Sequence, residues 1–418
     1  MLLRTGVKKK HSIAIILLAV CALGLAFQPA HGDSGWTPVI PGVDWRDFRL
    51  PGPTRAYVTR MDRSNPNITL ESGLPWGTLS GERQTVSDMV VHYDQTLSAW
   101  RGTWGDRNQV IAAINGSYFD LGTGEPNNGM VLGGWYTKMF SDLGGWSGFA
   151  WHYDRSAFVG ACVKHPSDGQ IFTNLINGDQ LPVDGINARV KNNQLVIFTP
   201  QFDAFSPGQK NGVEVVVGLY QPLGLRDPDK PTIGTVLSIH QGQGQLPIPF
   251  DAVVLSARGT AAESLLRTVR EGDVLAFTIQ IQHLEANCRT SSPFDWEGTY
   301  ASIGGTLPFL KEGEVIPFQD AGASQRHPRT AICFNDEWLY FVVVDGRDSA
   351  YSRGMTIPEL ADFCKDTLGA SWGVNEDGGG SSTLWLDGQV INRPSDGHER
   401  RVANSLMIVA LEPMQTSV

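Results

Sequence analysis

Short apolar segments bounded by turn residues recur along this chain, and few segments show helical periodicity. The clearest is Trp338 to Val344, and such runs predict buried strands. Similar runs occur at 109–114, 213–217, 252–255 and 274–279. Helices are predicted only near 85–100 and 356–368, each with a capping threonine at its start. Strands outnumber the helices that could serve as crossovers, so we predict an α+β fold: a mixed, mostly antiparallel β-sheet core with few helices.

The first 32 residues have the organisation of an export signal. Basic Arg4 and Lys8–Lys10 precede an apolar run of 15 residues, Ile13 to Phe27, and small residues then flank His31. The run is shorter than the ~20 residues of a membrane span. We therefore expect a secreted or extracytoplasmic protein without stable membrane insertion after cleavage. An uncleaved N-terminal anchor is the alternative.

The rest of the chain is expected to form two parts. Residues 33–108 are predicted as an N-terminal lead-in with short strands and one helix, and residues 109–412 as the main domain. Within the latter, residues 120–151 are rich in Gly and Trp and are predicted to form surface loops.

The net charge of −10 argues against a nucleic-acid partner, because nucleic-acid binding proteins usually have a basic surface. Removal of the predicted signal would make the protein more acidic still, since it would remove four basic residues. A local arginine cluster can still bind an anionic substrate. Four cysteines remain outside the signal, and Cys333 with Cys364 is the preferred disulfide pair. No H-x-x-x-H or C-x-x-C pattern occurs, so neither a zinc site nor a cofactor is predicted; a structural divalent cation is left open. No oligomeric state is indicated.

The most unusual segment is Asn375-Glu-Asp-Gly-Gly-Gly-Ser-Ser-Thr383. Its glycines, Gly378, Gly379 and Gly380, would let the backbone approach a ligand closely, and successive N–H groups could form an anion-binding nest. Ser381 and Ser382 add hydroxyl donors, and Asp377 would lie at the mouth of the loop. The alternative is a tight glycine turn between two elements.

Three further segments carry polar groups next to predicted strands. Asp345 and Arg347 follow the strand 338–344, Arg329 precedes another strand, and Asn115 ends the strand 109–114. An arginine fork suits a phosphate diester or a carboxylate. Taken singly, each segment would more often be an ordinary turn with solvated side chains.

Together these segments resemble the phosphodiester glycosidase family, which contains the lysosomal "uncovering enzyme" and secreted bacterial relatives. The resemblance covers roughly residues 110–410, in order, and implies that the domain 109–412 is a phosphodiester glycosidase-like catalytic domain. Its segments are INGSYFD (114–120), NARV (187–190), VEVVV (213–217), VLSARG (254–259), HPRTAI (327–332), VVDGR (343–347), SRGMTIPELADF (352–363), NEDGGGSST (375–383) and NRPSDGHERRVANSLMIV (392–409). One departure is Glu376, because the family usually has a small or apolar residue there.

The resemblance implies a hydrolase that cleaves the glycosidic bond of a sugar-1-phosphodiester, releasing the sugar and leaving a phosphomonoester. The expected substrate is a sugar-phosphate diester of a glycan or envelope polymer. Such a site needs a carboxylate near the anomeric carbon and donors for the phosphate. The alternatives are a metal-dependent phosphodiesterase, which would need clustered His and Asp ligands, and a non-catalytic glycan or cell-wall binding module.

Roles can be assigned on this basis. Asp377 is the best candidate for nucleophile or general base, with Asp345 second and Glu214 third. Arg347 and Arg329 are expected to clamp the phosphate. The remaining predicted substrate-binding residues are Gly378, Gly379, Gly380, Ser381 and Ser382 in the loop, and Asn115, Asn187 and Asn375, of which Asn115 and Asn187 would bind sugar hydroxyls.

Overall fold

The computed structural model describes residues 35–98, 108–142, 148–161, 163–226, 229–283, 296–306, 308–317 and 322–411. The predicted export signal, Cys162 and Cys288 lie outside these residues. Among the described helices, none has the length and apolar character that crossing a membrane requires.

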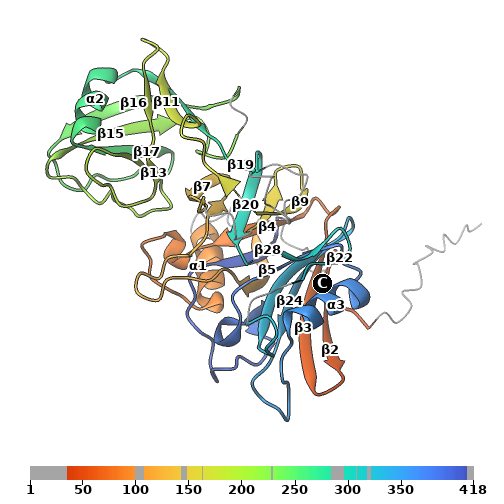
Figure 1. Ribbon diagram of the computed structural model, residues 1–418. Helices are drawn as coiled ribbons and strands as arrows, with labels where there is room; N and C mark the ends of the chain where they lie inside the picture. Colours follow the sequence, from red (N-terminus) through yellow and green to blue (C-terminus); the bar gives the residue numbers. More distant parts are fainter. Residues whose placement is uncertain are drawn as a thin grey trace, which may run out of the picture. The chain divides into compact units, whose positions relative to one another are not determined.

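The first large sheet brings together strands from both ends of the sequence (Figure 1). In spatial order its strands are β1 (Thr37–Ile40), β2 (Val43–Leu50), β3 (Thr54–Asp62), β24 (Trp338–Val344), β23 (Arg329–Phe334), β25 (Trp372–Asn375), β21 (Pro308–Lys311) and β22 (Glu314–Val315). Helix α3 (Ile357–Asp362) continues as a π-helical turn over Phe363–Thr367 and packs its apolar residues against this sheet. Thr356 caps this helix as expected, and it forms a capping box with Glu359.

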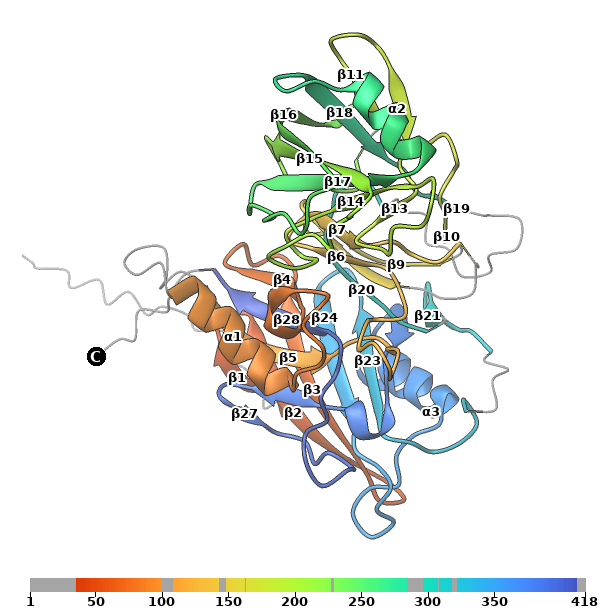
Figure 2. The same cartoon turned by 90° about the vertical axis from the view of Figure 1, so that its left-hand side faces the viewer.

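A second, five-stranded sheet lies beside helix α1 (Val86–Ser98), as Figure 2 shows for β5 and β28. Its strands, in order, are β27 (Gln389–Val390), β26 (Leu384–Leu386), β5 (Gln109–Asn115), β28 (Ser405–Ala410) and β4 (Ile68–Gly73). Val86, Met89 and Val90 of α1 are buried against this sheet. Thus strands from before residue 109 pair with strands of the expected catalytic domain in both sheets.

A third sheet is built from the middle of the chain, with helix α2 (Thr260–Thr268) beside it. Its strands are β12 (Gln180–Pro182), β11 (Gln170–Asn174), β18 (Val274–Ile279), β16 (Thr232–Gln241), β15 (Gly212–Leu219), β17 (Ala252–Arg258), β14 (Leu195–Phe198) and β13 (Gly185–Ile186). Helix α2 was not predicted from the sequence. It is short and amphipathic, and Ala262 and Leu265 on its inner side are buried.

Two smaller sheets complete the described structure. They comprise β7 (Trp135–Lys138), β6 (Met130–Leu132), β20 (Thr299–Gly304), β8 (Gly148–His152) and β9 (Ala157–Gly160), and separately β10 (Val163–Lys164) with β19 (Gln282–His283). The prediction of surface loops over 120–151 is therefore wrong for β6, β7 and β8. Phe149 and Trp151 belong to the core instead.

The predicted fold class is confirmed. Every strand pair in the described residues is antiparallel except β13 with β14. The helices predicted near 85–100 and 356–368 are also present as α1 and α3. Apolar side chains of the first two sheets and of β8 and β20 share one core, to which Ile114, Ile332 and Phe341 belong.

Candidate active site

Strand register places the predicted residues at the ends of two sheets. Arg329 is paired with Val344, which precedes Asp345, and Ala331 is paired with Asn375, so the polar residues collect at one end of the first sheet. In the second sheet Asn115 is paired with Ser405. The glycine loop runs from β25 of the first sheet to β26 of the second, and thus lies where the two ends meet.

Asn115 fastens this loop from the buried side. Its Nδ2 donates to the Asp377 carbonyl at 2.7 Å, and its Oδ1 accepts from the Thr330 hydroxyl at 2.8 Å and from the Thr383 N–H at 3.1 Å. The Asp377 N–H donates to the Gly116 carbonyl. Asn115 is fully buried and its amide is committed to the protein, so these contacts give it a positioning role in place of the predicted contact with sugar hydroxyls.

Each of the three glycines makes room for a different group. A Cβ on Gly378 would lie 2.7 Å from the Pro328 carbonyl oxygen, and one on Gly379 would lie 2.8 Å from a guanidinium nitrogen of Arg347. A Cβ on Gly380 would collide with Arg400 and Asp396. Gly379 also has a φ of 65°, which side chains disfavour. The loop therefore needs glycine for close contact with two arginines as well as for its turn.

Asp377 is the carboxylate held at the loop. It is 9% exposed, and burial raises the pKa of its carboxyl to about 6. The Ser381 hydroxyl, the Arg400 charge and the Gly378 N–H all act in the opposite direction. A carboxyl with this pKa exchanges its proton near neutral pH, as general acid–base catalysis requires.

Arg347 and Arg400 approach the loop and share Asp396. Arg347 Nη1 lies 3.4 Å from Ser395 Oγ and 3.7 Å from Asp396 Oδ1, and the Arg347 side chain is 48% exposed. Arg400 Nη2 lies 2.6 Å from Asp396 Oδ2, and its Nη1 donates to the Ser381 hydroxyl at 3.3 Å. The weak contacts and the exposure of Arg347 leave its donors able to bind an anion.

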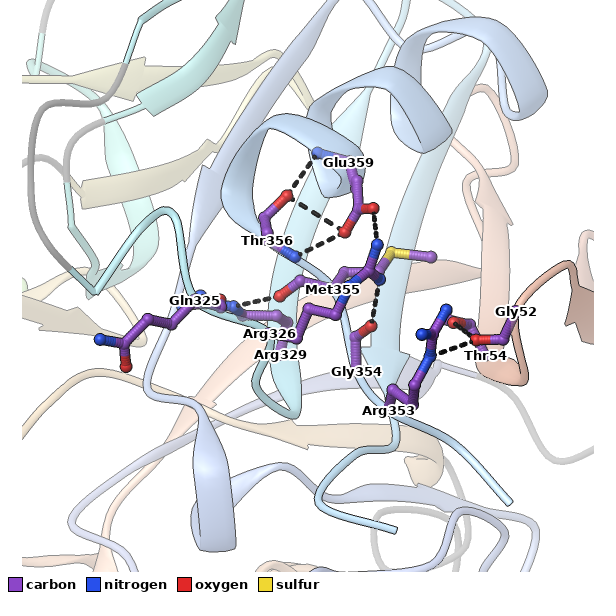
Figure 3. Close-up of polar contacts among 10 residues, drawn as sticks. All are labelled: Gly52, Thr54, Gln325, Arg326, Arg329, Arg353, Gly354, Met355, Thr356 and Glu359. Atoms are coloured by element: carbon purple, nitrogen blue, oxygen red, sulfur yellow. Dashed lines mark hydrogen bonds and ion pairs between the residues drawn. The ribbon is translucent and has the colours of Figure 1, made fainter. Parts of the chain in front are cut away.

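Arg329 has a different role from the predicted phosphate clamp. Its buried guanidinium donates to the carbonyls of Met355 at 3.0 Å and Gln325 at 2.8 Å (Figure 3). It also donates to the Gly322 carbonyl at 2.8 Å. These bonds tie the segment before β23 to the start of α3. The charges of Arg329 and Arg347 still add to the effect of burial in lowering the pKa of His327.

Asp345 is bound within the protein rather than open to a ligand. Its carboxylate accepts hydrogen bonds from the Asn392 amide at 3.0 Å and from the Arg393 N–H at 3.0 Å. Asn392 in turn donates to the Ser382 carbonyl, so Asp345 holds the far end of the glycine loop. Burial raises the pKa of the Asp345 carboxyl even though these donors favour its charged form.

The loop N–H groups are largely committed to the backbone. Gly379 donates to Pro328, and Ser381 and Ser382 donate to Gly378 and Gly379. These bonds do not support the predicted nest of free N–H groups, and Arg347 and Arg400 bring guanidinium donors to the same loop. The Ser382 hydroxyl and Asn375 Oδ1 are buried without a partner among the described residues.

Glu214 lies on a strand of the third sheet, and Asn187 directly follows another strand of that sheet. Glu214 is on β15, where Ser206 and Ser256 are beside it and burial raises its pKa. Asn187 follows β13; its amide donates to the Thr137 carbonyl and the Thr199 hydroxyl, and the Thr199 N–H donates to its Oδ1. Asn187 thus closes a turn, with a φ of 49°. These contacts of Glu214 and of Asn187 do not include any residue of the glycine loop.

Sequence reasoning missed Arg400 and Asp396. Both lie in the segment 392–409 that carries the family resemblance, but charge pairs in a tail segment are usually solvated. Their contacts with Gly380, Ser381 and Arg347, which the sequence does not reveal, identify them as part of the site.

Residues 234–409 match the family model described as phosphodiester glycosidase. The match includes Asp345, Arg347, the glycine loop and Arg400, whereas β5 with Asn115 precedes it. No curated protein matches the chain.

Two solved structures share the fold, with TM-scores of 0.58 and 0.56. A hypothetical protein from Synechocystis is 18% identical with a TM-score of 0.58, covering 90% of this chain; the chain spans only 63% of that protein. A Burkholderia pseudomallei protein described as a candidate exported protein is 20% identical with a TM-score of 0.56, covering 85% of this chain and 74% of that one. The zebrafish N-acetylglucosamine-1-phosphodiester alpha-N-acetylglucosaminidase catalytic domain, auto-inhibited by its pro-peptide, aligns at 15% identity and a TM-score of 0.43, covering 88% and 84%.

Proposed function

We propose that this chain hydrolyses the glycosidic bond of sugar-1-phosphodiesters outside the cytoplasm, because residues 234–409 match the phosphodiester glycosidase family model. The observation that carries the proposal is the placement of Asp377, with its raised pKa, on a glycine loop that two guanidinium groups approach. The N-terminal export pattern supports the location.

The charges of the site fit such a substrate. A phosphodiester carries one negative charge, and Arg347 is exposed enough to bind it beside Arg400. Guanidinium groups neutralise the charge that develops on the departing phosphate. Because a phosphomonoester is a good leaving group, the site needs no strong acid to protonate the glycosidic oxygen.

The reaction is balanced with water as the second substrate. The bond between the anomeric carbon and the phosphate oxygen breaks, and its electron pair leaves with the phosphomonoester. Water supplies the hydroxyl that ends on the sugar. Asp377 acts either as the base that takes the proton from this water or as the nucleophile that forms a glycosyl intermediate before water arrives.

The test is hydrolysis of a small sugar-1-phosphodiester in ¹⁸O-labelled water, with products followed by ³¹P NMR and mass spectrometry. We expect label in the sugar and a phosphomonoester without label. Label in the phosphate would instead identify cleavage of the P–O bond, as a metal-dependent phosphodiesterase performs it. Absence of turnover together with retained binding of the diester would identify a binding module.

Variants connect the activity to the site. Asp377→Asn and Arg347→Ala should each lose at least about 100-fold in kcat/KM, the range for removing a general base or a charged donor. Asp168→Asn, in an exposed turn, is the matched control and should retain full activity. Full activity of Asp377→Asn would refute the assignment.

A further inference from the structure

Trp76 is presented to solvent by a backbone that side chains disfavour. Its φ is 55° and its side chain is 61% exposed. For a bulky residue this conformation is a genuine outlier, and such strain persists only where the surroundings enforce it. The exposure and the strained backbone of Trp76 therefore suggest that its ring contacts a ligand.

The surroundings do enforce this conformation. The Trp76 N–H donates to Oε1 of the buried Gln84 at 2.8 Å, and Gln84 pairs through its backbone with Val402. Gly81 packs so closely on the Pro75 carbonyl that a Cβ there would collide with it. The indole ring stands at 74° to the His92 ring, with 5.6 Å between the centroids.

A groove of about 480 Å³ opens beside this ring. Its volume lies within the ~300–1,000 Å³ that small-molecule sites occupy. The residues that line it include Trp76, His92, Glu82, Asp88, Arg83 and Arg401. A second groove of about 340 Å³ shares Glu82, Arg83 and Arg401 and extends along 122–124.

The lining suits an uncharged sugar. Two acids and two arginines offer acceptors and donors for hydroxyl groups while their charges balance, so an ion of either sign gains little there. In the described part of the chain, Glu82, Asp88 and Arg401 have no ion-pair partner. The exposed indole gives an apolar face against which a pyranose ring can lie.

The groove is connected to the candidate active site through adjacent residues. Arg400 reaches the glycine loop, whereas the next residue, Arg401, lines the groove. Residues 122–124 line the second groove, and they follow the turn at Gly116. The Gly116 carbonyl accepts a hydrogen bond from the Asp377 N–H.

We propose that the groove formed by Trp76, His92, Glu82, Asp88, Arg83 and Arg401 is a subsite that binds a neutral saccharide unit of the glycan to which the phosphodiester belongs. The connection to a substrate glycan rests on the proposed function, but the saccharide site itself does not. Its role is to raise the affinity for polymeric substrate without taking part in bond cleavage.

Binding is tested on the full chain by calorimetric titration with three uncharged probes: triacetylchitotriose, cellotriose and maltotriose. We expect at least one to bind, and Trp76→Ala to weaken that binding about tenfold or more. Trp76→Gly should do the same while its urea midpoint does not fall, because glycine adopts a positive φ without strain. Tyr220→Ala, which removes another exposed aromatic side chain (73%), is the control and should bind as wild type does.

Activity separates this proposal from the proposed function. Trp76→Ala should hydrolyse a small sugar-1-phosphodiester as wild type does, but have a higher KM for a diester that carries the bound trisaccharide. The subsite is refuted if no probe binds, if Trp76→Ala binds normally, or if the variant changes only the sedimentation behaviour, which would indicate a contact between copies of the chain. Failure of wild type to hydrolyse the small diester would refute the proposed function alone.

Discussion

Asp377 should lower the stability of the folded protein as the pH rises, and Asp377→Asn should remove this effect. The pKa of its carboxyl is raised from 3.8 to about 6 in the folded state, because burial disfavours the charged form. Between these values the folded chain binds more protons than the unfolded chain. The group's contribution is therefore fully present below about pH 4 and is lost as the pH rises through 6.

The magnitude follows from the size of the shift. About two pKa units at 1.36 kcal/mol each give about 3 kcal/mol, a large fraction of the 5–15 kcal/mol typical of a folded domain. The stability difference between Asp377→Asn and wild type should therefore grow in favour of the variant by about 3 kcal/mol between pH 3.5 and 7.5. Effects of the substitution that do not depend on pH cancel in this comparison.

The assay is urea unfolding of both proteins at the two pH values. Asp377 also raises the pKa of Glu376 through its charge, so the measurement is repeated in a Glu376→Gln background to remove that coupling. Asp168→Asn, in an exposed turn, should show no pH-dependent difference from wild type. A difference for Asp377→Asn that stays constant with pH, or that shifts toward wild type, would refute the reasoning.

Three further outcomes are expected. If catalysis requires the ionised Asp377, kcat/KM should rise with pH through about 6, and a flat profile from pH 5 to 8 would contradict this role. Gly379→Ala and Gly388→Ala should each lose about 1 kcal/mol of stability from their positive φ, but only Gly379→Ala should lose activity, because Gly388 faces open space. Cys333 and Cys364, whose sulfurs lie 2.7 Å apart as free thiols, should form a disulfide when the protein meets an oxidant such as oxidised glutathione, which takes up their two electrons. Closing this loop should add about 3–4 kcal/mol, measured as the change in urea unfolding on reduction; an unchanged thiol count after oxidation would contradict it.

The strand-rich core could be predicted because its signal is local. Trp338 to Val344 is apolar, short and bounded by turn residues, and it forms β24 as expected. The prediction of surface loops over residues 120–151 was wrong in part because glycine occurs both in turns and where strands pack closely against a large side chain. Gly148 and Gly160 pack against the ring of Trp296 within paired strands, where a Cβ would crowd the ring, rather than forming loops. Composition alone does not distinguish packing from turning.

The sequence predicted the segments that form the site, but it did not predict which of their side chains face a ligand. The glycine loop with Asp377 and Arg347 could be recognised as a segment, and the structure does bring these residues together. Whether a polar side chain faces a ligand or the protein depends on contacts between distant segments. Arg329 binds three backbone carbonyls, and Asn115 binds the loop itself, and neither arrangement leaves a local trace in the sequence.

Glu376 shows how the site accommodates an acid where the family resemblance leads one to expect a small or apolar residue. Both of its carboxyl oxygens are buried without a partner among the described residues, and Gly305 provides space for one of them, because a Cβ there would lie 2.8 Å from Oε1. Burial first, and the charge of Asp377 second, raise the pKa of Glu376 well above its ordinary value. Both effects favour the protonated form of the Glu376 carboxyl. A protonated Glu376 is uncharged, as an apolar residue would be, and the loop then carries a single negative charge, on the carboxylate assigned to catalysis.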